Sequence, residues 1–130
     1  MKNTGKIIKV NYLAIFLTTL WIGFSEFLRN QLLFNYIWIE HYKELGLNFA
    51  SKPINGVIWM IWSAVFAVVI YKIYNKFNAK ETFVLSWVIG FLMMWLVIGS
   101  LGVLPIKLLL FAIPLSFIEV FGAIFIYKKD

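Results

Sequence analysis

The chain has 130 residues, of which 62% are hydrophobic and 14% charged, and it carries a formal net charge of +6. So small a soluble body cannot enclose that much apolar surface, so the composition excludes a soluble globular protein and indicates a membrane protein. The basic residues are scattered at the ends of apolar segments and form no stripe. This pattern excludes a nucleic-acid-binding protein and favours contact with anionic lipid headgroups. Cysteine is absent, which excludes disulfides and thiolate metal sites.

Four apolar segments, each long enough to cross a bilayer, fill most of the chain. At ~1.5 Å per residue, a helix of about 20 residues spans the ~30 Å hydrocarbon core. Only a helix satisfies its own backbone hydrogen bonds over that distance in lipid. The sequence therefore predicts a single all-α domain over residues 1–130, an integral membrane four-helix transmembrane bundle. Its spans are expected at residues 10–28, 53–71, 82–103 and 106–127.

The first span follows a basic start at residues 1–9, a combination that signal peptides also show. Its apolar run is at the long end for a signal peptide, and no Ala-x-Ala cleavage site follows it. We therefore expect this span to be retained as a transmembrane helix.

The connection between the first two spans contains an amphipathic segment at about residues 31–46. Phe34, Trp38, Tyr42 and Leu45 recur there at helical spacing. This pattern predicts an additional amphipathic, interfacial helix between helices 1 and 2, with its aromatic edge in the headgroup layer. Since no Pro or Gly separates the segment from the first span, it could instead continue that helix outward. The sequence favours neither alternative.

Local signals also mark the ends of the third span. Asn78 and Glu81 have the spacing of a capping box, so the third helix is expected to begin at Ala79, outside the bilayer. Gly102 and Pro105 predict a tight connection to the fourth span. The third and fourth helices should therefore be antiparallel neighbours.

Basic residues are more numerous on the side of the bundle that holds both termini. By the positive-inside tendency, this bias places both termini in the cytoplasm. We expect an integral protein of the bacterial cytoplasmic membrane, the inner membrane. The eight basic residues on the terminal side are Lys2, Lys6, Lys9, Lys72, Lys76, Lys80, Lys128 and Lys129, and the four on the other side are Arg29, Lys43, Lys52 and Lys107.

One carboxylate, that of Glu119, lies deep inside a predicted span, ~13 Å from Lys128 by helical rise. A carboxylate at that depth costs about 2.5 kcal/mol or more on insertion, so it should face the bundle interior or a subunit contact. Ser116 lies on the same helical face, and Pro114 removes a backbone hydrogen bond nearby. These three residues form a candidate intramembrane polar site. The structural alternative is a protonated Glu119 that ties two helices together by a hydrogen bond.

Glu26, Arg29 and Asn30 form a second candidate, an outer polar cluster. Glu26 and Arg29 are an i,i+3 pair of opposite charge. At ~25 Å from Lys9 by helical rise, the cluster is expected near the outer headgroups. An ion pair that anchors the first helix is the favoured interpretation. The functional alternative is a polar mouth that binds an anionic headgroup or solute through Arg29.

The six tryptophans are assigned to packing and to the membrane boundaries. Trp38, Trp59 and Trp95 fall near the expected outer boundary, as an aromatic belt predicts. Trp21 lies deeper, and its indole N–H therefore needs a partner.

No motif tied to a specific chemistry is present, so two function classes stay open. The first is a homo-oligomeric transporter or channel-like protein for a small solute, cation or lipid, with Glu119 as the responding group. The second is a non-catalytic accessory protein that binds lipid or a membrane protein partner. A membrane enzyme is disfavoured because a single histidine, and one basic residue near the outer carboxylate, make a poor catalytic set. We expect no cofactor, no metal site and no nucleic acid, with membrane lipids and a second copy of the chain or another membrane protein as partners.

Overall fold

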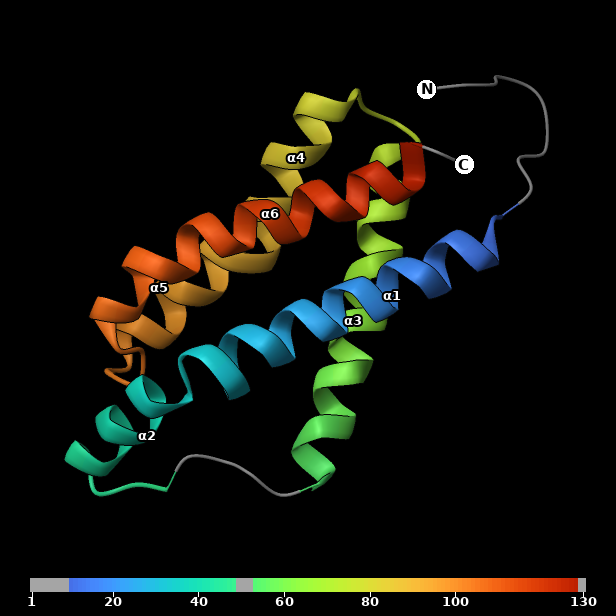
Figure 1. The fold of residues 1–130 in the computed structure, drawn as a ribbon. Coiled ribbons are helices and arrows are strands. Elements are labelled where there is room, and N and C mark those ends of the chain that lie inside the picture. The colour runs from blue at the N-terminus through green and yellow to red at the C-terminus, as the bar shows by residue number, and fades with distance from the viewer. Residues whose placement is uncertain (1–9, 49–52, 129–130) are drawn as a thin grey trace.

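A computed structural model describes residues 10–48 and 53–128 of the protein. Regular secondary structure within these ranges is entirely helical, and four helical segments are long and apolar enough to cross a membrane. The chain is therefore an all-α membrane protein built on four spanning helices, as the sequence predicts (Figure 1). The four segments cover Tyr12–Leu33, Pro53–Tyr74, Ala79–Ser100 and Ile106–Lys128.

Three of the four spans are assembled from more than one kind of helix. The first is α1 (Tyr12–Phe27) followed by a π-helical segment, η1 (Leu28–Leu33), and the second is α3 (Pro53–Tyr74) alone. The third is α4 (Ala79–Trp87), a π-helical segment η2 (Val88–Leu92) and α5 (Met93–Ser100), and the fourth is a 3₁₀ turn η3 (Ile106–Leu108) and α6 (Leu109–Lys128). Segments of π-helix are rare and are found frequently at functional sites.

The start of α4 is fixed by the capping box expected from the sequence. Asn78 Oδ1 accepts a hydrogen bond of 2.8 Å from the Glu81 N–H, and Glu81 Oε1 accepts one of 3.3 Å from the Asn78 N–H. Two backbone donors that the helix itself leaves unpaired are satisfied in this way. The third helix therefore begins at Ala79, as predicted.

The first helix continues beyond its predicted end and then breaks. It runs on to Leu33, and Phe34 leaves the helical region at φ −124° and ψ 20°. The chain then turns into α2 (Asn35–Glu44), the additional helix that the sequence predicts. Both alternatives left open by the sequence contribute, since the helix first continues outward and a separate helix follows.

The aromatic edge of α2 contacts the bundle. The Phe34 ring stacks on the Phe111 ring with centroids 5.0 Å apart, and Trp38 packs partly buried against the core. His41 Nε2 lies 2.8 Å from the Gly102 carbonyl oxygen, in the connection between α5 and η3. Phe34 and Trp38 therefore face protein, a correction to the expectation that this edge lies among headgroups.

Helix α1 contacts α3 and α6, which also contact each other, and α4 contacts both α3 and α6. Residues 10 and 128 lie at one end of the bundle, which we call the terminal end, and α2 and the Gly102 connection lie at the other, the distal end (Figure 1). In this view α3 crosses α1 steeply, and the two helices diverge on the distal side of the crossing. A cavity in this distal half is lined by residues of both the first and the second span.

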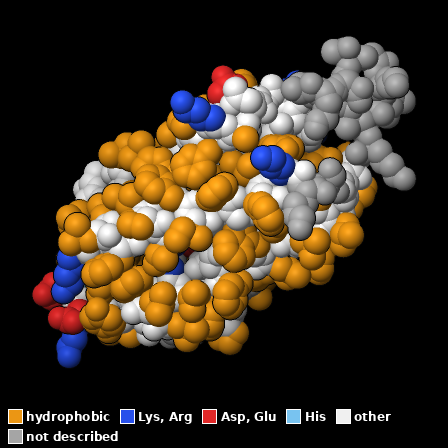
Figure 2. Space-filling view, turned by 45° about the horizontal axis from the view of Figure 1, so that its top comes forward, with side chains coloured by type: hydrophobic (Ala, Val, Ile, Leu, Met, Phe, Trp, Pro, Cys, Tyr) orange, Lys and Arg blue, Asp and Glu red, His pale blue; other side chains and the backbone are white. Residues whose placement is uncertain are grey.

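The sides of the bundle are apolar. Figure 2 shows hydrophobic side chains covering the flank of the molecule, with charged side chains gathered toward its two ends. Large side chains on several spans are strongly exposed, among them Leu96, Leu110 and Phe121. A contiguous apolar surface of this extent suits contact with lipid.

Several predictions concern residues outside the described ranges. The basic start at residues 1–9, which raised the question of a signal peptide, is one of these segments. Residues 52 and 129, which count toward the charge bias, are also outside. The cytoplasmic placement of the termini stays a prediction.

Candidate functional site

The two polar sites that the sequence treats separately form a single buried cluster. Arg29 Nη2 donates to Glu26 Oε1 at 2.6 Å, and Arg29 Nη1 donates to Glu119 Oε1 at 3.2 Å. Asn30 Nδ2 donates to the same Glu26 oxygen at 3.1 Å. All four side chains are buried, and Glu119 is 0% exposed. The expectation of two separate sites is corrected by the contact between Arg29 and Glu119. We call these four residues the charged cluster.

The direction of helical side chains explains why depths estimated from helical rise placed the two sites apart. Side chains on an α-helix lean toward the helix N-terminus. Since α1 runs toward the distal end, Arg29 leans back toward the terminal end. Because α6 runs in the opposite direction, Glu119 leans toward the distal end. The long arginine side chain therefore spans the offset between the two backbones.

Neighbouring aromatic side chains hold the charged cluster in place. The Arg29 guanidinium lies over the Phe91 ring, 5.3 Å from its centroid, in a cation–π contact. The Trp21 indole Nε1 donates to the Glu119 backbone oxygen at 2.7 Å, which provides the partner that this tryptophan was expected to need. Both ends of the ion pair between Arg29 and Glu119 are thus fixed by packing as well as by charge.

The charged cluster contains more negative than positive charge. With all groups ionised, two carboxylates surround one guanidinium, which leaves one negative charge unbalanced. Glu26 Oε2 and Glu119 Oε2 are buried and have no hydrogen-bond donor within the described part of the chain. Unpaired buried charges are costly, so the arrangement favours the gain of one positive charge, either a proton or a cationic ligand.

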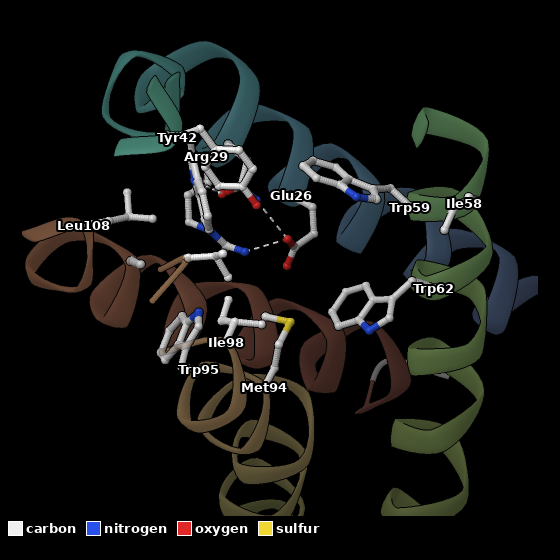
Figure 3. Close-up of a pocket in the computed structure, with 14 residues that line it drawn as sticks. Glu26, Arg29, Tyr42, Ile58, Trp59, Trp62, Met94, Trp95, Ile98 and Leu108 are labelled. Carbon is white, nitrogen blue, oxygen red and sulfur yellow. Dashed lines mark hydrogen bonds and ion pairs between the residues drawn. The ribbon is translucent and has the colours of Figure 1, made fainter. Parts of the chain in front are cut away.

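A cavity of about 360 Å³ lies beside the charged cluster, in the distal half of the bundle. Glu26, Arg29 and Asn30 contribute to its wall, whereas Glu119 is not among the lining residues and lies behind Arg29. Figure 3 shows the Glu26 carboxylate directed into the space bounded by helices α1, α3, α5 and α6. The rest of the lining is mostly apolar and includes five aromatic side chains, which are Trp38, Tyr42, Trp59, Trp62 and Trp95.

Asn30 joins the charged cluster to α2. Its Nδ2 donates to Glu26, and its Oδ1 accepts a hydrogen bond of 3.0 Å from the Trp38 indole. Helix α2 therefore covers the cavity through Trp38 and Tyr42 and is connected to the acid inside it.

Ser116 and Pro114 have other roles than those expected from the sequence. The Ser116 hydroxyl donates to the Ile113 carbonyl oxygen at 2.7 Å and accepts from the Trp87 indole at 2.8 Å, so it links α6 to α4. Pro114 lies inside α6, which continues through it to Lys128. Of the predicted intramembrane site, Glu119 alone belongs to the charged cluster.

The sequence interpretation missed the aromatic walls of the cavity. It assigned Trp59 and Trp95 to a membrane boundary, but in the structure both line the cavity whose wall also includes Glu26. A signal was available, because tryptophans at similar depth on different helices are equally compatible with a shared interior wall. Within the described ranges, no group of three or more His, Cys, Asp or Glu residues is placed to hold a metal ion.

Comparison with known proteins gave no match to a family model, a curated protein or a solved structure. The functional assignment therefore depends on the geometry of the charged cluster and the cavity.

Proposed function

We propose that the protein binds a small organic cation with an apolar body in the distal cavity and transports it across the membrane. The observation that carries this proposal is a buried cluster of two carboxylates and one guanidinium at the wall of an aromatic cavity, in which one oxygen of each carboxylate has no hydrogen-bond donor within the described part of the chain. In this role Glu26 is the counter-ion that meets the ligand, and Arg29 and Glu119 set the charge behind it. An intramembrane ionisable group is a functional candidate by default.

The lining favours an organic cation over other ligands. Tryptophan rings attract a cation placed over their faces, and Trp59, Trp62 and Trp95 offer three such rings. An anion would be repelled by the negative charge of the carboxylates. A neutral apolar molecule would leave the excess negative charge of the cluster uncompensated. Calcium or magnesium requires about six oxygen ligands, many more than the cavity supplies. An ammonium group attached to an apolar body satisfies both the acid and the walls.

The helices around the site support a role in transport rather than in binding alone. The π-helical segment η1 carries Arg29 and Asn30, and η2 carries Phe91 beneath the guanidinium. Irregular helical turns of this kind are places where spans bend. Exchange of a proton for the ligand at the unbalanced carboxylate would couple such motion to a proton gradient. With the termini in the cytoplasm, the cavity lies in the outer half of the membrane.

A homo-oligomer, which the sequence suggested as the setting for a path between subunits, stays a prediction.

Binding is tested with purified protein in lipid nanodiscs by quenching of tryptophan fluorescence. The probes are phenyltrimethylammonium and tert-butylbenzene, which share a shape and differ in charge. We expect saturable binding of the cation alone, and a loss of about tenfold or more in affinity in Glu26→Gln, because charge-assisted contacts contribute about 1.5–3 kcal/mol. Glu44→Gln, the same change at an exposed position of α2, serves as the matched control.

Equal binding of the two probes, or an unchanged affinity in Glu26→Gln, would contradict the proposed site. Absence of binding would favour the alternative in which the charged cluster is a structural tie between helices. Transport is tested separately by uptake of radiolabelled phenyltrimethylammonium into proteoliposomes with a pH gradient. Saturable binding without uptake would refute transport while retaining the binding site.

A further inference from the structure

A second hollow lies on the lipid-facing side of the bundle, between α1 and α3. It is a groove of about 450 Å³, and its lining residues follow one face of each helix. On α1 they include Gly23, Phe24 and Phe27, and on α3 they include Gly56, Trp59 and Met60. We call this hollow the α1–α3 groove.

The α1–α3 groove adjoins the ligand cavity at Trp59, whose side chain lines both hollows. In Figure 3, Trp59 projects from α3 into the same cavity as Glu26, which belongs to α1. A molecule whose charged end is at Glu26 would therefore pass Trp59 to reach the groove.

Two glycines shape the groove. A Cβ added at Gly23 would lie 2.7 Å from Met60 Sδ, so the Met60 side chain of α3 packs closely against α1 at this point. A Cβ added at Gly56 would meet nothing within 4 Å, so the groove is open at that point. The groove thus has a tight end at the crossing and an open end near the start of α3.

The walls of the groove suit a hydrocarbon chain. Phe24 is 58% exposed, Phe27 is 50% exposed and Met60 is 42% exposed, although all three lie within spans. In a membrane these surfaces meet lipid tails, and an alkyl chain is the apolar occupant that the surroundings supply. The ligand cavity, in contrast, contains the acid.

We propose that the transported ligand is a single-chain cationic amphiphile, with its ammonium head at Glu26 and its alkyl tail past Trp59 in the α1–α3 groove. This inference rests on the proposed function, because it requires a cation in the cavity. It implies that the ligand enters sideways from the bilayer between α1 and α3.

The placement of the tail is tested by photolabelling. The probe is an octyltrimethylammonium ion with a diazirine at the end of its tail, added to the protein in nanodiscs, and the labelled residues are mapped by mass spectrometry. We expect labelling at Phe24, Phe27 and Met60, prevented by excess phenyltrimethylammonium because the two heads compete for Glu26.

The outcomes separate the two proposals. Labelling that phenyltrimethylammonium prevents, but that falls on cavity walls other than the groove, overturns the placement of the tail and leaves the cation site intact. Labelling of the groove that phenyltrimethylammonium does not prevent overturns the inference, because the groove then takes up any alkyl chain from the bilayer. Failure of phenyltrimethylammonium itself to bind would refute the proposed function.

A variant that fills the groove provides an independent check. Gly56→Phe adds a side chain where a Cβ has no neighbour, and glycine is a poor helix former, so folding should be retained. We expect a fall of about fivefold or more in competed labelling at Phe27, with unchanged affinity for phenyltrimethylammonium. Val57→Phe, which adds similar bulk at the next, 54% exposed position outside the groove lining, is the matched control. Equal labelling in the two variants overturns the inference.

Discussion

The terminal and distal halves of the bundle are built in opposite ways. Near the terminal end, Ala67, Ile70 and Ala123 are 0% exposed, and Tyr127 donates a hydrogen bond of 2.6 Å to the Ala67 carbonyl oxygen. In the distal half the helices diverge around a cavity. Glu26 and Arg29 line this cavity, and Glu119 lies behind Arg29. Since the same four spans pack solidly in one half, the hollow in the other is a specific feature of the fold. Substitutions that damage one half and leave the other intact test this contrast.

Removal of the Arg29 guanidinium should have the largest effect on the free energy of unfolding. Arg29→Met leaves two buried carboxylates without their positive partner, and breaking a buried ion pair in this way costs about 3–5 kcal/mol. The measurement is the free energy of unfolding in detergent, together with binding of phenyltrimethylammonium. We expect a large loss of stability and a disturbed cation site.

The charge explanation of that effect has its own control. Combining Arg29→Met with Glu26→Gln and Glu119→Gln removes the unpaired charges, so most of the lost stability should return. If the single and the triple variant were equally unstable, packing of the arginine side chain rather than charge would be responsible.

Overpacking next to the charged cluster, by a side chain added at Gly122, should have the next largest effect on the free energy of unfolding. A Cβ added at Gly122 would lie 2.5 Å from Trp21 Cε2, in the ring that donates to the Glu119 backbone. Gly122→Ala is expected to lower the free energy of unfolding by about 1–3 kcal/mol, which is typical of overpacking. Gly56→Ala, where nothing lies within 4 Å, should be neutral or stabilising by up to about 1 kcal/mol. Similar destabilisation in both would show that steric contact is not the cause.

A smaller effect is expected from the terminal half. Tyr127→Phe removes the hydrogen bond to the Ala67 carbonyl oxygen and should lower the free energy of unfolding by about 1 kcal/mol. Affinity for phenyltrimethylammonium should not change, because the cavity lies in the other half. A reduced affinity would show that the two halves are energetically coupled.

The smallest effect on stability is expected from Glu119→Gln. An amide oxygen still accepts from Arg29, so folding and insertion should be retained to within about 1 kcal/mol, while the unbalanced negative charge is removed. In the unmodified protein, protons compete with the cation, so affinity should fall as pH is lowered from 8 to 5. The variant should bind more weakly and show no pH dependence. If Glu119→Gln kept the full pH dependence, Glu119 would have no part in the proposed exchange of a proton for the cation.

Local patterns were sufficient to predict the helices. Hydropathy located all four spans, and the residues of the capping box at Asn78 and Glu81 are neighbours in sequence. No comparable local signal marks the π-helical segment after Phe27, and at the break Phe34 contacts Phe111, which is distant in sequence. The helix was therefore predicted to end at residue 28, five residues before its end in the structure.

The charged cluster could not be assembled from the sequence in the same way. Arg29 and Glu119 are 90 positions apart, and their contact depends on which helices are neighbours and on the opposite lean of their side chains. Each residue was recognised as a candidate on its own. The cavity requires in addition the divergence of α1 and α3, which is a property of tertiary packing.

The single amide of Asn30 connects the interior of the protein with its surface. Its nitrogen depends on an acceptor at Glu26, and its oxygen holds Trp38 of α2. When Glu26 binds a cationic ligand, it becomes a weaker acceptor for that nitrogen, so the position of α2 is expected to relax. A probe attached to the exposed side of α2 would then report the occupancy of a site buried among the spans, without any modification of the site.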